Sequence, residues 1–246
     1  MRRALVLVVL GGLFLTAGAA ARSDSSLTVF AAASLTDAFP KIDHSPTYSF
    51  AGSNTLAAQI RQGAPADVFA SANMTLPEGL YKDHLCSKPV VFTRNALVVI
   101  VPRSNPASIH SVYDLRRSGV KIVIAAPGVP VGSYTLRVLE NMNLTSAVLA
   151  NVVSRESDVR EVLAKVALNE ADAGFVYSTD ARTVPTKVRV IRIPAWAQPK
   201  VRYGICVVSA SSHKTAAHAF VKRVMRRAGQ KVLIRFGFLP RVKPKR

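Results

Sequence analysis

Short hydrophobic runs alternate with amphipathic segments along the chain from Leu27 onward. The runs have strand character, whereas the amphipathic segments have apolar residues at helical spacing. In the first part of the chain, strands are expected at 27–31, 47–50 and 68–70, and helices at 35–39 and 56–62. Pro40 is expected to end the first helix, because proline cannot continue a helix interior. Residues 73–88, which follow, are polar and turn-rich. Strands and helices in alternation predict an α/β fold.

Two longer β-rich runs, 90–101 and 201–208, enclose a second series of strands and helices. Its strands are expected at 121–125, 151–153, 173–177 and 188–193, and its helices at 134–141 and 159–169. A chain that leaves one α/β unit on a long strand and returns on another predicts two lobes joined by two hinge crossings, with the ligand cleft between them. We expect a second lobe at 94–201 and a discontinuous first lobe at 22–93 and 202–246. The segment 215–236 has apolar residues at helical spacing and is expected to pack on the first lobe.

The first 21 residues have the composition of an export signal. Two arginines precede an apolar run and a row of small residues at 17–21, and cleavage after Ala19 or Ala21 fits the small-x-small rule. An uncleaved anchor is the alternative, because residues 4–21 carry no charge and reach the lower length limit for crossing a bilayer. No cysteine lies near enough to carry a lipid. We favour a signal peptide at 1–21 and an exported, soluble protein in the periplasm or at the outer face of the cytoplasmic membrane.

The chain is strongly basic, with 33 Lys and Arg against 14 Asp and Glu and a formal net charge of +19. Loss of Arg2 and Arg3 with the signal would leave about +17. Such a balance also occurs in nucleic-acid-binding proteins. Three features argue against a nucleic-acid partner. The protein is expected to be exported, aromatic residues do not lie among the basic ones, and the basic residues of 214–235 lie on the solvated side of an amphipathic helix. We interpret the charge as a solvated surface with a general attraction for anions.

The chain has two cysteines, Cys86 and Cys206. Export to an oxidising compartment permits one disulfide between them. Two free buried thiols are the other alternative, because the sequence does not place the two Cα atoms within bridging distance.

Four short turns rich in Gly, Ser and Ala lead from a strand into a helix, at 31–37, 51–55, 127–134 and 157–160. A helix N-terminus presents unpaired backbone N–H groups and the positive end of the helix dipole, so it favours a small anion. In α/β sheets the turns at the carboxyl ends of strands face one crevice, where ligands bind. The first three turns contain no Lys or Arg. This pattern predicts an anion that is held by neutral donors and released unchanged.

Serine hydroxyls are the first candidate donors. Ser34 follows the first strand and precedes Asp37 by three residues, which is the spacing of a capping box. Its oxygen would then accept from a first-turn amide, and its proton would be free for a ligand. For any single serine a plain helix cap is the simpler interpretation, and the same holds for Ser53, Thr55 and Ser133. Their shared position after strands favours a site.

The later turns supply three further candidate donors. Val131 and Val159 have no side-chain donor, so they can act only through a backbone N–H at the start of a helix. Pro130 fits the first position of such a helix, because it needs no donor there and its φ is already suitable. Tyr177 ends the run 173–177, and its phenol could close the cleft as one more donor.

Five blocks of the sequence, in order, resemble the periplasmic molybdate-binding proteins of molybdate ABC transporters. The blocks are 27–35, 50–53, 62–71, 129–134 and 174–177, and the similarity extends from about residue 27 to Pro240. The resemblance implies a type 2 periplasmic binding protein fold that closes on its ligand by hinge motion. Two segments of the first lobe, 35–47 and 73–88, are shortened relative to the family.

The same resemblance implies the ligand and the residues that hold it. The ligand would be molybdate, and tungstate as well, bound as a tetrahedral oxyanion without direct protein–metal ligands and without a cofactor. The donors would be the hydroxyls and amides of Ser34 and Ser53, the amides of Val131 and Val159, and the hydroxyl of Tyr177. Val131 replaces an alanine that is common in the family. The implied partners are an ABC permease and its ATPase subunit, and we expect a monomer.

An enzyme and a receptor for another anion are the alternative interpretations. The five histidines lie in no metal-ligand spacing, and the chain has neither a G-x-S-x-G elbow nor a Walker loop, so we expect no enzyme activity. A binding protein for another oxyanion such as sulfate, or for a small organic anion, remains the alternative. A selective phosphate site would need a buried acceptor for the remaining proton. Sulfate and molybdate differ chiefly in size, and only the family resemblance favours molybdate.

Overall fold

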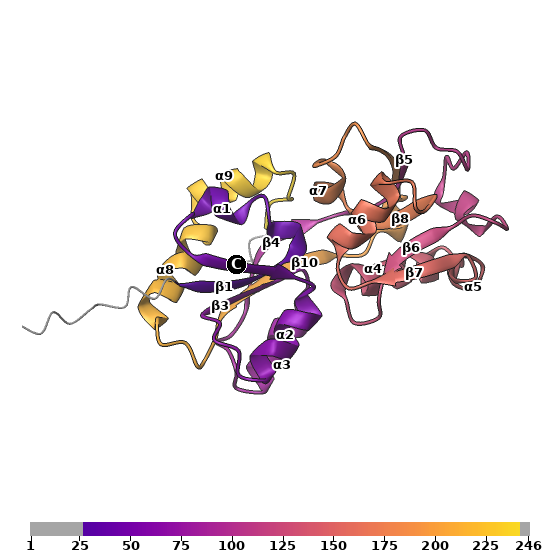
Figure 1. Ribbon diagram of the computed structural model, residues 1–246. Helices are drawn as coiled ribbons and strands as arrows, with labels where there is room; N and C mark the ends of the chain where they lie inside the picture. Colours follow the sequence, from indigo (N-terminus) through magenta and orange to yellow (C-terminus); the bar gives the residue numbers. More distant parts are fainter. Residues whose placement is uncertain (1–26, 242–246) are drawn as a thin grey trace, which may run out of the picture.

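The computed structural model describes residues 27–241, and the predicted signal peptide lies outside them. These residues form two five-stranded sheets, which lie in separate halves of the molecule (Figure 1). The predicted two-lobed α/β architecture is therefore confirmed. The lobe limits after residues 93 and 201 remain a prediction. Within the described chain, no helix has both the length and the apolar character needed to cross a membrane.

The first sheet has the strand order β2-β1-β3-β10-β4. Its strands are β1 (Thr28–Ala32), β2 (Thr47–Ala51), β3 (Val68–Ser71), β4 (Val90–Asn95) and β10 (Val201–Val207). β1 is parallel to β2 and β3, whereas β10 is antiparallel to β3 and β4. Every residue of β3 is buried, as expected for a strand covered on both faces. The carboxyl ends of β1, β2 and β3 meet at one edge of this sheet.

Helices cover both faces of the first sheet, with α8 and α9 on one side and α2 and α3 on the other (Figure 1). The helical elements here are η1 (Ala33–Leu35), α1 (Phe39–Ile42), α2 (Ser53–Arg61), α3 (Thr75–Lys82), α8 (Lys214–Met225) and α9 (Arg227–Arg235). The Phe39 ring lies 5.8 Å from that of Phe92 and 5.7 Å from that of Phe220, between ring centroids. Aromatic pairs at this separation hold α1, β4 and α8 together.

Two expectations for this lobe were wrong in detail, and a segment with no predicted element forms a helix. Pro40 does not end a helix but lies in the first turn of α1, where its missing N–H is tolerated. The polar segment 73–88 contains the helix α3, which buries Pro77 and Leu80. The expected helix at 215–236 is two helices, because Arg226 is extended with ψ of 162° and ends α8 before α9 begins.

The second sheet has the strand order β7-β6-β8-β5-β9. Its strands are β5 (Leu97–Pro102), β6 (Ile122–Ala125), β7 (Val152–Glu156), β8 (Ala173–Tyr177) and β9 (Val188–Arg192). The helical elements are η2 (Val112–Arg116), α4 (Pro130–Asn141), α5 (Thr145–Leu149), α6 (Val159–Ala167), α7 (Ser178–Ala181) and η3 (Ala195–Ala197). β6 is parallel to β7 and β8, so the carboxyl ends of these three strands also share an edge. The sequence pattern predicted strands at each of these positions and the helices α4 and α6, but not η2, α5, α7 or η3.

The chain crosses between the sheets twice. The expected long strand at 90–101 is two strands that separate at Ala96, with β4 in the first sheet and β5 in the second. The return crossing lies between β9 and β10. The Gln198 side chain joins the crossings, because its Oε1 accepts from the Leu97 N–H (3.2 Å) and its Nε2 donates to the Leu97 carbonyl (2.7 Å).

Cys86 and Cys206 are both buried in the first lobe as free thiols. They belong to a hydrophobic cluster with Phe30, Leu56 and Phe69. A hydrogen bond with Cys206 lowers the pKa of the Cys86 thiol, and the same contact, together with burial, raises the pKa of Cys206. Of the two alternatives that the sequence left open, this structure contains the free thiols.

Candidate functional site

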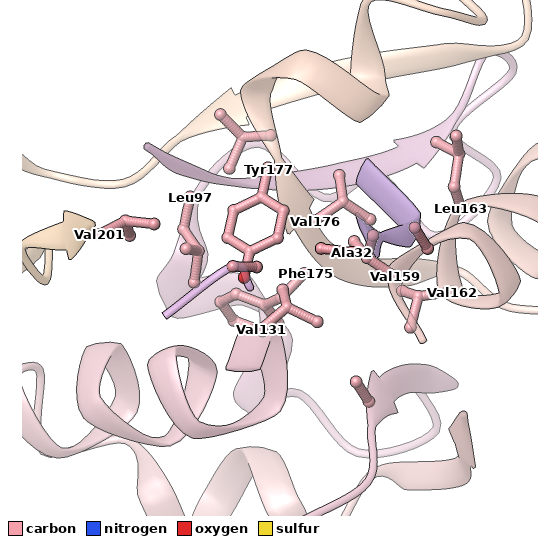
Figure 2. Close-up of a cluster of buried hydrophobic side chains, with 14 of the residues drawn as sticks. Ala32, Leu97, Val131, Val159, Val162, Leu163, Phe175, Val176, Tyr177 and Val201 are labelled. Atoms are coloured by element: carbon pink, nitrogen blue, oxygen red, sulfur yellow. The ribbon is translucent and has the colours of Figure 1, made fainter. Parts of the chain in front are cut away.

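A small cavity of about 10 Å³ lies where the turns of the two sheets meet. All five predicted donor residues line it, and they come from both lobes: Ser34, Ser53, Val131, Val159 and Tyr177. Figure 2 shows the three from the second lobe among the buried side chains of this region. Thr55 and Ser133, which the sequence also suggested, do not line this cavity. The structure therefore brings together residues that are far apart in the sequence.

Ser34 lies within η1, directly after β1, and is buried. The predicted capping box with Asp37 is wrong, because η1 has no side-chain cap and Asp37 pairs with Arg160 instead. The Ser34 Oγ lies 2.8 Å from the hydroxyl of Tyr203 on β10. Tertiary packing rather than local capping thus fixes this hydroxyl.

A chain of hydrogen bonds sets the direction of the Ser34 hydroxyl. The Asn95 Oδ1 accepts from the Ala96 N–H (2.9 Å), so its Nδ2 is the donor toward the Tyr203 oxygen (3.3 Å). Burial raises the pKa of Tyr203 well above its usual value, so the phenol keeps its proton. The Tyr203 oxygen accepts from Asn95, and in its hydrogen bond with Ser34 either hydroxyl can be the donor. When Tyr203 donates, the Ser34 proton is available to the cavity.

Ser53 is the first residue of α2, and Gly52 is its N-cap. The Ser53 Oγ accepts from the Ala72 N–H at 3.1 Å, just after β3. Because this bond uses the oxygen as an acceptor, the hydroxyl proton remains free to be donated. The first-turn amides of α2 also have no intrahelical partner. Ser53 therefore offers two donors of different kinds at one position.

Val131 and Val159 hold corresponding places in the second lobe. Pro130 opens α4, as predicted, so Val131 is the second residue of that helix. Val159 is the first residue of α6. The N-cap of α6 is Asp158, whose Oδ1 accepts from the N–H groups of Arg160 (2.6 Å) and Glu161 (3.2 Å). This cap does not use the Val159 N–H, which is left for the cavity.

Tyr177 ends β8 and is completely enclosed. Its hydroxyl has no partner of acceptable hydrogen-bond geometry among residues 27–241. Burial, with Tyr203, Tyr134 and Asp180 nearby, raises the pKa of Tyr177 well above its usual value, so the hydroxyl stays protonated. A buried polar group without a partner is costly, and a ligand acceptor would satisfy it.

The cavity has neutral donors and one charged lining residue, Asp158. Burial raises the pKa of Asp158, while the N–H groups that it caps oppose this shift. The nearest cation along the chain, Arg160, does not line the cavity. Within the described chain, no group of three or more His, Cys, Asp or Glu residues could hold a metal ion. The arrangement fits a small anion that is bound by oriented hydroxyls and amides.

Sequence reasoning missed Asn95, Tyr203 and Gly52. The first two act through contacts with residues more than 80 positions away, and no local pattern marks them. A Cβ atom on Gly52 would lie 2.3 Å from the backbone oxygen of Ser157 in the other lobe. The position of Gly52 before the serine of its turn was the one available signal.

Comparison with known proteins gives a consistent result. Residues 27–239 match the family of bacterial extracellular solute-binding proteins. The molybdate-binding protein ModA of Mycobacterium tuberculosis is 39% identical over 223 residues, covering 87% of this chain and 84% of its own length. ModA of Escherichia coli is 30% identical, covering 92% of this chain and 93% of its own length.

Solved structures share the fold at lower identity. The periplasmic molybdate-binding protein of Azotobacter vinelandii superposes with a TM-score of 0.77 at 21% identity, covering 89% of this chain and 100% of its own. The sulfate-binding protein SubI of M. tuberculosis has a TM-score of 0.76 at 19% identity, covering 88% of this chain and 87% of its own. The same architecture therefore occurs in receptors for two different tetrahedral oxyanions.

Proposed function

Because this chain belongs to the bacterial extracellular solute-binding proteins, we infer that it captures molybdate and delivers it to an ABC importer. The observation that carries this inference is the convergence of five neutral donor residues from both lobes on one small cavity. Members of this family are binding components of transport systems and not enzymes.

We propose that the ligand is bound as the intact oxyanion. The hydroxyls of Ser34, Ser53 and Tyr177 and the amides of Val131 and Val159 would donate to its oxygens. Hydrogen bonds to a charged acceptor are stronger than neutral ones, so five neutral donors compensate for the desolvation of the anion. No cation has to be displaced for release. Rotation of the lobes about the crossings would open the site.

Tungstate has nearly the same charge and size as molybdate, and we propose that it binds as well. Sulfate is the main competitor, since a sulfate receptor shares the fold. Phosphate keeps a proton at neutral pH and needs an acceptor. The only carboxylate among the lining residues is Asp158, whose Oδ1 already accepts from two amides of α6. Because the five proposed donor residues offer the ligand donors alone, we propose that the site favours fully deprotonated anions.

We further propose that the mature protein is an exported monomer that acts at the outer face of the cytoplasmic membrane. Its partners would be a permease and the ATPase subunit that drives it. The excess of basic residues would attract anions in general without contributing to selectivity.

Isothermal titration of the mature protein, stripped of bound anions, tests the function directly. Molybdate, tungstate, sulfate and phosphate are titrated separately. We expect tight one-to-one binding of the first two and little heat from the others. A sulfate signal without a molybdate signal would overturn the ligand assignment and retain the neutral-donor site. No heat with any of the four would overturn the oxyanion receptor.

A further inference from the structure

We propose that Arg160 is a positioning residue that locks the two lobes in the closed state. Its side chain connects both lobes beside the anion cavity without lining it. The Arg160 Nε lies 2.9 Å from the Asp180 Oδ1 in the second lobe, and its Nη2 lies 2.5 Å from the Asp37 Oδ2 in the first lobe. This inference rests on the proposed function of the cavity.

Each member of this ionic triad lies on a segment that carries a proposed ligand donor. Asp37 follows Ser34 by three residues, Arg160 follows Val159 directly, and Asp180 follows Tyr177 by three residues. The triad therefore joins three of the five donor segments. A donor moves with its segment, so the ion pairs fix the relative positions of donors from both lobes.

The two aspartates differ in how freely they can part from Arg160. The Asp180 side chain is completely buried, whereas that of Asp37 is 42% exposed and that of Arg160 is 27% exposed. Burial raises the pKa of Asp180 to about 7, and the Arg160 guanidinium opposes this shift. A buried carboxylate that lost its cation would be strongly destabilised, so Arg160 stays with Asp180. Asp37 can be solvated when the lobes separate, so the Arg160–Asp37 ion pair is the one that breaks on opening.

A second contact between the lobes lies close to Arg160 in the chain. Gly52 of the first lobe approaches the carbonyl of Ser157 so closely that a Cβ atom would not fit. Ser157 and Arg160 belong to the same short stretch at the start of α6. This stretch thus meets the first lobe through a backbone contact at Gly52 and an ion pair at Asp37. The lobes are therefore in contact beside the anion cavity, and this closed arrangement is the one that the Arg160–Asp37 ion pair would stabilise.

The test compares Asp37→Asn with a matched variant, Asp83→Asn. Asp83 pairs with Arg61 at 3.0 Å, and both side chains are about as exposed as Asp37, but this ion pair lies within the first lobe. Stopped-flow displacement of molybdate by excess tungstate gives the dissociation rate. We expect about fivefold faster dissociation for Asp37→Asn, with little change in association rate, because the lost contact exists only in the closed state. Asp83→Asn and the conservative Asp37→Glu should stay near the wild-type rate.

Equal dissociation rates for Asp37→Asn and wild type would overturn the lock. Thermal unfolding of the ligand-free variants checks that the effect is not a loss of folding, since Asp37→Asn should match Asp83→Asn. Small-angle X-ray scattering separates this proposal from the proposed function. If the wild type fails to bind molybdate, a larger radius of gyration for Asp37→Asn than for Asp83→Asn still supports the lock, and equal radii reject it.

Discussion

The two lobes place their proposed turn donors at corresponding points of similar sheets but use different atoms, apart from the Tyr177 hydroxyl that the second lobe adds at the end of β8. The order β2-β1-β3 in the first sheet corresponds to β7-β6-β8 in the second, and each set is parallel. The turns after β1 and β2 present the hydroxyls of Ser34 and Ser53, whereas the turns after β6 and β7 present the amides of Val131 and Val159. The topology therefore determines where donors can lie, and the residue at each turn determines whether the donor can be removed by mutation.

The contact between the lobes gives the largest expected effect. Gly52→Ala should weaken molybdate binding by about 3 kcal/mol, or roughly a hundredfold, because the new methyl group meets a backbone carbonyl that cannot yield. Alanine is compatible with φ of −56° and ψ of 132° at Gly52, so the ligand-free protein should fold normally. Titration calorimetry and circular dichroism measure the two outcomes.

Gly79→Ala is the matched control for this substitution. Gly79 lies in α3, away from the other lobe, and its nearest neighbour is the flexible end of Arg61. We expect wild-type affinity for this variant. Tight binding by Gly52→Ala would show that the lobes do not have to meet at Ser157 for capture.

Removal of a first-lobe hydroxyl should have the next largest effect. Ser34→Ala and Ser53→Ala each lose a hydrogen bond to a charged acceptor, which costs about 1.5–3 kcal/mol of binding free energy. Calorimetric titration with molybdate gives the change for each variant. Wild-type affinity in both would refute the assignment of these side chains as donors.

The hydrogen-bond chain behind Ser34 predicts a smaller effect. Tyr203→Phe removes the phenol that directs the Ser34 hydroxyl, and we expect a loss of about 1 kcal/mol in binding. The exposed Tyr81 provides a matched control, since Tyr81→Phe should change nothing. If Tyr203→Phe bound as tightly as wild type, the hydroxyl of Ser34 would not depend on Tyr203 for its direction.

The turns after β6 and β7 should be less sensitive to loss of a side chain than the turns after β1 and β2. Val131→Ala keeps the backbone N–H, so molybdate affinity should change by less than about threefold. Because Val131 is buried, the free energy of unfolding should fall by about 1–3 kcal/mol. Differential scanning calorimetry and titration separate the two effects. A large loss of molybdate affinity in Val131→Ala would mean that the valine side chain shapes the cavity. The contrast between side-chain donors and backbone donors would then not hold.

The sequence pattern was sufficient for most strands and for the turns that meet at the cavity, whereas the family resemblance was needed to select the five residues among the candidates. Strands such as β8 have short apolar runs with clear ends, and the turns after them lie at one sheet edge by topology. The errors arose where distant contacts decide the outcome. Ser34 pairs with a tyrosine 169 residues away and not with its own helix. The helix α3 contains Pro77 and Gly79, so its local sequence resembles a loop. The helix is recognisable only from the residues that it buries against the lobe.

The link between the two crossings at Gln198 limits how the protein can move. Because one amide side chain bonds both backbone groups of Leu97, the crossings cannot slide past each other without breaking two hydrogen bonds. These bonds favour a rotation of the lobes about the crossings over a sliding motion. In such a rotation the proposed donors of one lobe would reach the anion together, and partly coordinated states should be short-lived. Capture would be an all-or-none event, although the five donor residues are distributed over more than 140 positions of the sequence.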